Sequence, residues 1–372
     1  MGLGVSQAVR DLTEADLIAR IHARLPAAPD WLVVGIGDDA AVVEPERNRL
    51  DVLSADALVD GVHFDRTFTP PGAIGHRALA ANLSDLAAMG ATPRLALVSL
   101  ALPPALLLAE FDEMIEGVIA LAGRYRVTIV GGNLTRTPGP LTIDITIAGT
   151  VKRRGALTRA GARPGDELYV TGTIGAAAAG LQMLKERAKN STTENSTIRS
   201  STTENTEANG DHGQEKGSPC PPSSSASSVV ESCVHRYLYP EPRVRLGTLI
   251  GRNRAASACM DLSDGLADAV RRIAEASGVG ATIDAARLPL DPAARRWFER
   301  QGVNPVHEAI TGGDDYELLI AVRPRTRRRL AAAERHGDRP LTGIGACTAD
   351  RAIVLRDNGA EQPLPRGYSH FR

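Results

Sequence analysis

The pattern of apolar and polar positions predicts a chain in which strands and helices alternate. From 140 to 151, apolar residues at every second position alternate with Thr and Asp, which is typical of a strand with one buried face. The continuous apolar run at 94–102 predicts a strand buried on both faces. Further strands are expected at 31–34, 49–54, 127–130 and 258–260. Helices are expected at 14–25, 72–89 and 240–251, in the segment that ends at Gly123, and after Ser263 and Asp264, which are expected to cap the last helix.

The helix expected at 72–89 places an acidic side chain on an apolar face. Ala78, Asn82, Asp85 and Met89 lie at i, i+4, i+7 and i+11, so they share one face of the helix. A buried carboxylate needs a hydrogen-bonding partner, an opposite charge or a metal ion. Two interpretations stay open: Asp85 points to solvent, as most aspartates do, or it has such a partner.

Length and element pattern indicate an α/β (α+β) protein with two domains. A chain of 372 residues corresponds to about two domains of roughly 150 residues each. We expect a first domain at 1–155 and a second at 156–372. Within the second, the segment at about 185–232 contains STTEN twice, then a Ser- and Pro-rich tract with few apolar residues. Such a segment buries too little surface to offset the entropy of ordering it, so we expect a disordered surface loop.

Composition and charge exclude several classes of partner. The chain is 43% hydrophobic but only 3% aromatic, so platforms that stack single-stranded nucleic-acid bases are not expected. A formal net charge of −1 favours neither a nucleic-acid backbone nor an anionic membrane. The N-terminus lacks an apolar signal core, and no apolar run reaches the ~18 residues of a membrane span. We therefore expect a cytoplasmic protein with no nucleic acid and no membrane as partner.

Five acidic turns carry the chemistry of this sequence. Each places one or two Asp side chains beside a small or turn-forming residue. They are GIGDDA at 35–40, SAD at 54–56, NLSD at 82–85, DLSDG at 261–265 and TGGDDYE at 311–317. A single Asp in a turn is usually a cap or an Asx-turn. Five such turns point instead to several Mg²⁺ ions, because Mg²⁺ takes oxygen ligands, usually carboxylates together with water and phosphates.

Other phosphate-handling devices are missing from the sequence. There is no G-x-x-x-x-G-K-[ST] loop, and the Gly35–Ala40 turn has two Asp residues where a dinucleotide pyrophosphate would have to approach. The sequence also has no G-x-S-x-G nucleophile, no metal-binding histidine spacing and no metal-binding cysteine spacing. The remaining mechanism is direct phosphoryl transfer, in which the protein positions the reactants and neutralises charge without a protein nucleophile.

Several long motifs in a fixed order resemble the thiamine-monophosphate kinase family of the aminoimidazole-ribonucleotide synthetase-like superfamily. They are GIGDDAAVV, SADALVDGVHF, HRALAANLSDLAAMGATPR, GGNLTRT, LTRAGARPGDELYVTGTIG, MDLSDGLADAV, TGGDDYELL and the terminal GYSHF. The resemblance implies transfer of the γ-phosphoryl group of ATP to thiamine phosphate, the last step of thiamine diphosphate biosynthesis. It also implies a homodimer in which the N-terminal sheets pair into a barrel.

The resemblance assigns roles residue by residue. The Mg²⁺ ligands that it implies are Asp39, Ser54, Ala55, Asp56, Asp85, Asn133, Asp261 and Asp264. The ATP contacts are Gly132, Asn133, Arg159 and Ser263, with Tyr125 beside the adenine. The contacts to thiamine phosphate are His63, Asp314 and Tyr368.

This chain departs from the family pattern at three of these positions. Ala55 stands where Thr is frequent, so only its backbone carbonyl could be a ligand. Asn133 stands where Asp is common, and Asp314 replaces a common Glu. Two alternatives stay open: another ATP-using enzyme of the superfamily, or a non-catalytic sensor of nucleotide and thiamine phosphate.

Overall fold

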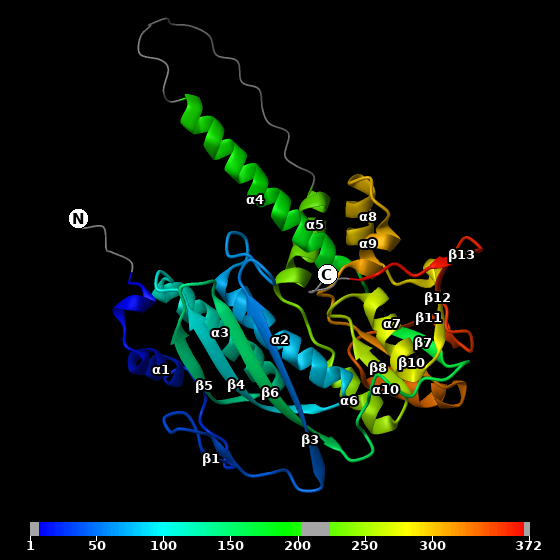
Figure 1. Ribbon diagram of the computed structural model, residues 1–372, viewed down its shortest axis with the longest axis horizontal. Coiled ribbons are helices and arrows are strands. Elements are labelled where there is room, and N and C mark those ends of the chain that lie inside the picture. Colours follow the sequence, from blue (N-terminus) through cyan, green and yellow to red (C-terminus); the bar gives the residue numbers. More distant parts are fainter. Residues whose placement is uncertain (1–6, 202–223, 368–372) are drawn as a thin grey trace, which may run out of the picture.

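The computed structural model describes residues 7–201 and 224–367, which form two α/β halves built around two separate sheets (Figure 1). A two-stranded ribbon lies beside the first sheet. The first half carries a four-stranded sheet and the second a seven-stranded sheet. The predicted mixed α/β fold is therefore confirmed, while the domain boundary at 155/156 stays a prediction.

The sheet of the first half has the strand order β3-β6-β4-β5. Only β4 and β5 are parallel; the other neighbours pair in antiparallel fashion. The strands are β3 (Arg49–Val59), β4 (Thr92–Leu102), β5 (Thr128–Arg136) and β6 (Thr142–Lys152). The helices are α2 (Pro71–Ala88) and α3 (Leu108–Tyr125), which cover one face (Figure 1). The smaller elements are η1 (Val9–Asp11), α1 (Glu14–His22), β1 (Leu32–Val34) and β2 (Val42–Val43).

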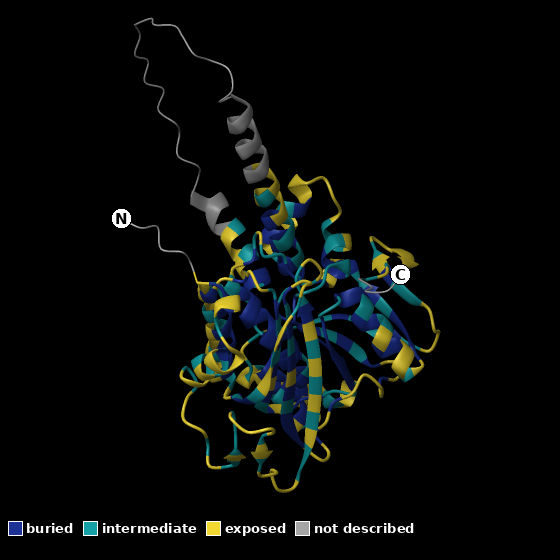
Figure 2. Ribbon diagram, turned by 60° about the vertical axis from the view of Figure 1, so that its left-hand side comes forward, coloured by how far each residue is buried: buried dark blue, intermediate teal, exposed yellow. Residues whose placement is uncertain are grey.

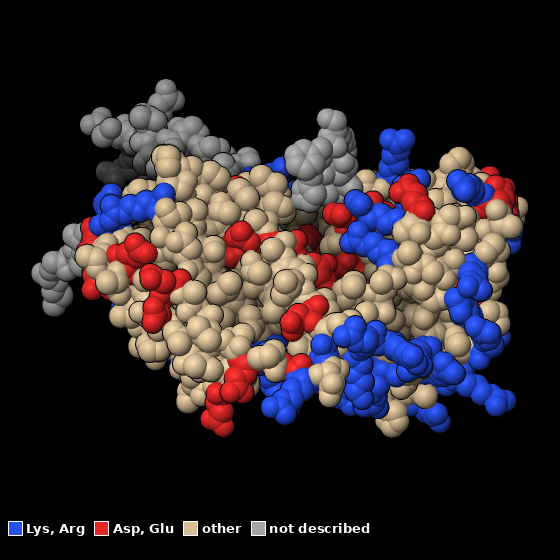
Figure 3. Space-filling view, turned by 60° about the horizontal axis from the view of Figure 1, so that its bottom comes forward, with Lys and Arg blue, Asp and Glu red and all other residues tan. Residues whose placement is uncertain are grey.

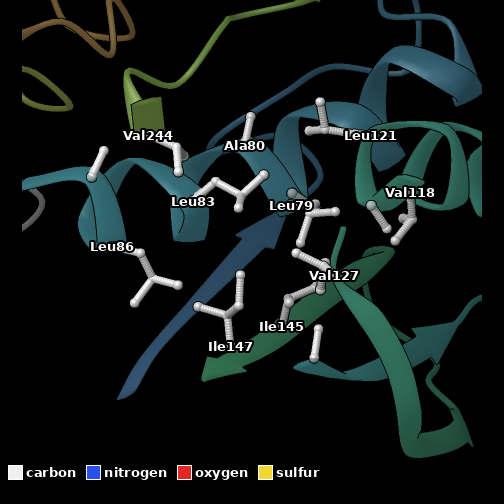
Figure 4. Close-up of a cluster of buried hydrophobic side chains, with 14 of the residues drawn as sticks. Leu79, Ala80, Leu83, Leu86, Val118, Leu121, Val127, Ile145, Ile147 and Val244 are labelled. Atoms are coloured by element: carbon white, nitrogen blue, oxygen red, sulfur yellow. The ribbon is translucent and has the colours of Figure 1, made fainter. Parts of the chain in front are cut away.

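The core of this half lies between the sheet and the two helices (Figure 4). Ile145 and Ile147 of β6 are fully buried against Leu79 and Leu83 of α2, as the predicted alternation along this strand requires. The opposite face of the sheet is more exposed. Along β3, half-buried residues alternate with exposed ones (Figure 2), and Leu53 keeps 70% of its surface exposed.

Glycines allow α2 and α3 to approach closely. A Cβ atom on Gly75 of α2 would lie 1.9 Å from the Met114 carbonyl oxygen of α3. A Cβ atom on Gly117 of α3 would lie 2.1 Å from the Gly72 carbonyl oxygen. Both distances are far below van der Waals contact, so only glycine fits at these positions.

The second half contains a seven-stranded sheet with the order β13-β12-β9-β11-β7-β10-β8. Its strands are β7 (Glu167–Thr171), β8 (Ala258–Asp261), β9 (Gly280–Asp284), β10 (Leu318–Val322), β11 (Leu341–Thr348), β12 (Ile353–Asp357) and β13 (Ala360–Pro363). Its helices are α4 (Ala176–Ser201), α5 (Ser224–Leu238), α6 (Val244–Asn253), α7 (Leu266–Ser277), α8 (Pro292–Arg300), α9 (Pro305–Thr311) and α10 (Arg327–His336), with short 3-10 helices η2 (Ala285–Arg287) and η3 (Pro324–Thr326).

Helix α2 joins the two halves. It packs on β3 and β6 of the first sheet and also contacts α6 and β8 of the second half. The contact with α6 is close, because a Cβ atom on Gly247 would lie 2.1 Å from the Ala87 carbonyl oxygen. Side chains that project from the two sides of α2 can therefore meet groups from both halves.

Two predicted segments differ from the structure. The prediction of a disordered loop at about 185–232 is wrong at both ends, because α4 continues to Ser201 and α5 begins at Ser224. The part of this segment at 202–223 lies outside the described residues. The helix expected from Pro240 begins at Val244, because Pro242 disfavours helical backbone at the residue before it. Arg243, the N-cap residue, is buried and paired with Glu317. Hydrophobic periodicity carries no information about that ion pair.

Charged side chains are segregated on the face shown in Figure 3, although the net charge of the chain is only −1. Lys and Arg gather on one part of that face, and Asp and Glu form separate groups. Among the described residues, no helix is both long enough and apolar enough to cross a membrane.

Candidate active site

A cavity of about 790 Å³ collects most of the residues that the sequence singled out. Its wall draws on both halves of the molecule. It is lined by Asp56, His63, Asp85, Arg159, Asp261, Ser263, Asp264 and Asp314. Tertiary folding thus brings four of the five acidic turns to one site, since SAD, NLSD, DLSDG and TGGDDYE each contribute a carboxylate.

Helix α2 connects the acidic groups of the two halves. Ser54 on β3 donates a hydrogen bond from Oγ to Asp85 Oδ2 on α2. The neighbouring residue Ser84 donates from Oγ to Asp261 Oδ2 on β8, at 2.8 Å. Asp85 is half-buried and has a partner, so the second of the two interpretations of its place on the helix is confirmed.

Burial and neighbouring carboxylates suppress the ionisation of Asp261 and Asp56. The pKa of Asp261 is raised to about 7, first by burial and then by the charge of nearby Asp85, although Ser84 and Arg159 act in the opposite direction. The pKa of Asp56 is also raised, first by burial and then by Asp85. A crowded group of buried acids is unfavourable by itself and becomes favourable when a cation is bound among them.

The polar side chains of the turn after β8 line the cavity. We expected Ser263 and Asp264 to cap α7, but the residue that precedes this helix is Gly265, which has φ 93° and makes no side-chain cap. A Cβ atom at Gly265 would lie 2.5 Å from the Gly312 carbonyl oxygen. Glycine therefore allows the helix to start later, and both Ser263 and Asp264 line the cavity instead of capping.

The donor set suits Mg²⁺. It consists of carboxylate and hydroxyl oxygens, which are the hard ligands that Mg²⁺ prefers. Within the part of the chain that the structure describes, no three Asp, Glu, His or Cys side chains converge into a complete cage for one ion. Any Mg²⁺ bound here would therefore need further ligands from water and substrate phosphates.

The other end of the cavity contains a group that sequence reasoning missed. The Arg77 side chain is only 1% exposed, and its Nη2 lies 3.2 Å from Asp314 Oδ1. Its guanidinium also lies 4.1 Å from the ring centroid of Tyr237 and donates to the Tyr237 carbonyl oxygen at 2.5 Å. The motif HRALAANLSD carried the only signal, because an Arg on an otherwise apolar helix face requires a partner.

The acidic residues of the TGGDDYE turn have two different roles, lining the cavity and stabilising the fold. Asp314 faces the cavity, whereas Asp315 accepts hydrogen bonds from the backbone N–H of Gly175, at 2.7 Å, and Ala177 at the start of α4. Burial raises the pKa of Asp315 to about 7.

Glu317, the last residue of this turn, is fully buried. It accepts hydrogen bonds from Arg243 Nε at 2.6 Å, Arg236 Nη2 at 3.0 Å and Thr171 Oγ1 at 2.5 Å. Sequence reasoning predicted a ligand role for Asp314 and none for Asp315 and Glu317, and these two residues hold the fold.

Several predicted residues lie away from this cavity. Asp39, Gly132 and Asn133 line a second cavity of about 810 Å³ at the β5 edge of the first sheet. Ala55 is exposed on β3. The Tyr125 hydroxyl donates to the Pro242 carbonyl oxygen at 3.0 Å, and this side chain lines neither cavity. Tyr368 lies outside the described residues.

Two family models match the chain in succession. The N-terminal domain of AIR synthase related protein matches residues 37–151, and the C-terminal domain of the same protein matches residues 163–358. Among relatives, the thiamine-monophosphate kinase of Escherichia coli (strain K12) is 36% identical over 361 residues, which cover 96% of this chain and 98% of the relative. That of Bacillus subtilis (strain 168) is 32% identical and covers 91% of this chain and 94% of its own length.

Solved structures agree with these matches. The thiamine-monophosphate kinase from Stenotrophomonas maltophilia K279a has a TM-score of 0.72 at 34% identity, and the match covers 93% of this chain and 96% of the other. AaThiL complexed with AMPPCP and TMP has a TM-score of 0.69 at 29% identity, with 98% of both chains covered. The hydrogenase maturation protein HypE in complex with ATP has a TM-score of 0.69 at 16% identity, so it shares the fold alone.

Proposed function

Because this chain belongs to the family of AIR synthase related proteins and matches thiamine-monophosphate kinases over nearly its whole length, we infer that it is a thiamine-phosphate kinase. It transfers the γ-phosphoryl group of ATP to the phosphate of thiamine phosphate. An oxygen of the acceptor phosphate forms the new P–O bond, the bond to the β-phosphate oxygen breaks, and ADP leaves. The products are thiamine diphosphate and ADP.

The observation that carries this function is the meeting of four acidic turns in one cavity. Asp56, Asp85, Asp261 and Asp264 from three of these turns, and Asp314 from the fourth, come from both halves of the molecule and line the same cavity. An acidic cluster cannot hold two polyanions directly, since unit charges of like sign ~4 Å apart repel by roughly 4 kcal/mol at an effective dielectric of 20. The cluster is suited to reactants that arrive with cations.

We propose that Asp56, Asp85, Asp261 and Asp264 hold Mg²⁺, with Ser54 keeping Asp85 in place through its hydrogen bond. Bound Mg²⁺ would neutralise charge on the transferring phosphoryl group. Arg159, which is exposed in the same cavity, offers a guanidinium for phosphate oxygens. The acceptor phosphate is already anionic at neutral pH, so the reaction needs no general base from the protein.

We also propose that the enzyme is a homodimer and acts in the cytoplasm. β3 and β5 are the two edges of the four-stranded sheet, and exposed edges and apolar faces are the usual sites of association. If β3 of one copy pairs with β5 of another, the two sheets close into a barrel. Gly132 and Asn133 of the second copy then approach Asp56 of the first. This pairing would reunite predicted ligands that one chain divides between two cavities.

The kinase is tested by measuring ADP formation from ATP and Mg²⁺ with thiamine phosphate, with thiamine and without acceptor. We expect ADP and thiamine diphosphate in equal amounts with thiamine phosphate alone. Asp56→Ala and Asp264→Ala should abolish turnover without unfolding the protein. Ligand binding without ADP would support a sensor instead. No response to either thiamine compound would favour another reaction of the superfamily.

The shared site is tested by mixing inactive subunits. Asp56→Ala and Asn133→Arg should each be inactive alone. Mixed dimers should regain activity, because one of their two sites then combines an intact Asp56 with an intact Asn133 from the other copy. A mixture that exchanges subunits but stays inactive would contradict this arrangement.

A further inference from the structure

The end of the cavity that contains Asp314 is built around one buried guanidinium, that of Arg77. Besides its contact with Asp314, Arg77 Nη2 donates to the His63 carbonyl oxygen at 3.4 Å. Arg77 therefore joins the two residues for which the family resemblance implies contacts with thiamine phosphate. Its position on α2 is two turns before the acidic end of the same helix, where Ser84 and Asp85 lie.

The wall around Arg77 suits a flat ring. Phe64, Phe68, Tyr237 and Tyr316 line the cavity, in a chain with only 3% aromatic residues. Tyr237 and Tyr316 are nearly fully buried. Aromatic rings gathered beside a few fixed polar groups are typical of sites for heteroaromatic ligands.

The Asp314 carboxylate is held by one of its two oxygens. Arg77 Nη2 lies 3.2 Å from Oδ1, and the Tyr316 hydroxyl donates to the same oxygen at 3.2 Å. Among the described residues, no hydrogen bond or ion pair reaches Oδ2, although the side chain is 30% exposed and lines the cavity. Oδ2 is therefore the oxygen that a ligand can reach.

The backbone also fixes this carboxylate. Asp314 has φ 67° and Tyr316 has φ 50°, and left-handed backbone is rare for a bulky residue such as Tyr. The Asp314 N–H donates to the Ser263 carbonyl oxygen at 2.8 Å, which ties this segment to the acidic turn after β8. Strained conformations of this kind persist where the surroundings over-determine them, and they cluster at ligand sites.

Charge decides what Oδ2 can bind. The Asp314 carboxylate is already paired with the Arg77 guanidinium, so the pair has almost no net charge to attract the thiazolium cation. What remains is a hydrogen-bond acceptor in a desolvated, aromatic surrounding. The rings of thiamine phosphate carry one N–H donor group, the amino group on the pyrimidine.

We propose that Arg77 is a positioning residue that fixes Asp314 so that Oδ2 accepts a hydrogen bond from the pyrimidine amino group of thiamine phosphate. This inference rests on the proposed kinase function. It assigns selection of the pyrimidine to a buried arginine on the helix that also carries Asp85. A site built to accept from an N–H group discriminates strongly against an analogue that lacks it.

The test compares thiamine phosphate with oxythiamine phosphate, which has an oxygen in place of the amino group. The wild-type enzyme should prefer thiamine phosphate by at least about 10-fold in kcat/KM, since loss of a buried hydrogen bond leaves an unpaired acceptor. Arg77→Lys should raise KM for thiamine phosphate by about 10-fold, reduce this preference, and leave KM for ATP within about twofold. Tyr316→Phe removes one donor to Oδ1 and keeps the ring. It should also raise KM for thiamine phosphate and reduce the preference for this substrate, by smaller factors than Arg77→Lys.

Two further single variants and one double variant separate positioning from simple stability. Arg243→Lys is the matched control, because Arg243 is equally buried and is paired with Glu317 of the same turn. It should lower Tm as Arg77→Lys does but leave the preference between the two substrates unchanged. Asp314→Asn should lose the preference, and the double variant with Arg77→Lys should be no worse than Asp314→Asn alone, because the two residues act as one unit.

Three results would overturn the inference. Arg77→Lys with unchanged KM and unchanged preference would make Arg77 a structural residue only. An equal rise of KM for both substrates would mean that the amino group is not the contact. Full additivity in the double variant would exclude action through Asp314. Failure of the kinase function itself is distinguishable, because the wild-type enzyme would then form no thiamine diphosphate.

Discussion

The acidic cluster should make the metal-free enzyme less stable as the pH rises, and Asp261→Asn should remove the part of that effect that Asp261 contributes. Burial and the charge of Asp85 raise the Asp261 pKa from 3.8 to about 7. Between these two values the folded state binds more protons than the unfolded state, so stability is lost as the pH rises through this window. Asn has no proton to lose, so the variant lacks this contribution.

The magnitude follows from the two pKa values. A shift from 3.8 to about 7 destabilises the folded state by about 2 kcal/mol at pH 5 and by about 4 kcal/mol at pH 8. The free energy of unfolding of the variant minus that of the wild type should therefore grow by about 2–3 kcal/mol between these pH values. Any cost of burying the new amide is independent of pH and cancels in this comparison.

Urea unfolding in EDTA at pH 5 and pH 8 measures this difference. Asp30→Asn is the matched control, because Asp30 is exposed and lies outside the cavity, and it should show no pH-dependent difference. Mg²⁺ at pH 8 should stabilise the wild type more than Asp261→Asn. A difference that is the same at both pH values would refute the reasoning, since it would mean that Asp261 ionises as freely in the folded protein as in the unfolded chain.

Three other changes test the scaffold. Glu317→Gln should lower the free energy of unfolding by about 3 kcal/mol, because it leaves the buried Arg243 without its counter-charge, and urea unfolding would show a loss below 1 kcal/mol if the pair were unimportant. Gly75→Ala should lower Tm by several degrees or prevent folding, since its Cβ atom would lie 1.9 Å from the Met114 carbonyl oxygen; an unchanged Tm would show that α2 and α3 can separate cheaply. Replacing residues 202–223 by a short Gly/Ser linker should leave kcat and both KM values unchanged, and steady-state kinetics that differ by more than twofold would show that this segment contributes to the site.

Local features of the sequence determined the elements and the chemistry. The alternation at 140–151 identified β6, because successive side chains of a strand point to opposite faces of the sheet. Thr13 was recognisable as a helix cap from its neighbours, and the capping box with Asp16 is present. The acidic turns indicated Mg²⁺-assisted phosphoryl transfer, because ligand preference depends on residue type.

Tertiary structure alone decided which of these groups meet and which serve the fold. Ser84 and Asp261 are 177 residues apart in sequence, yet they share a hydrogen bond across α2 and β8. Arg77 belongs to the site because folding buries it beside Asp314. Glu317 has a structural role because folding pairs it with two arginines. The sequence determines period, capping and ligand type because these depend on near neighbours. Burial, pairing and pKa depend on segments far apart in the chain, and only the packing of the two halves fixes those distances.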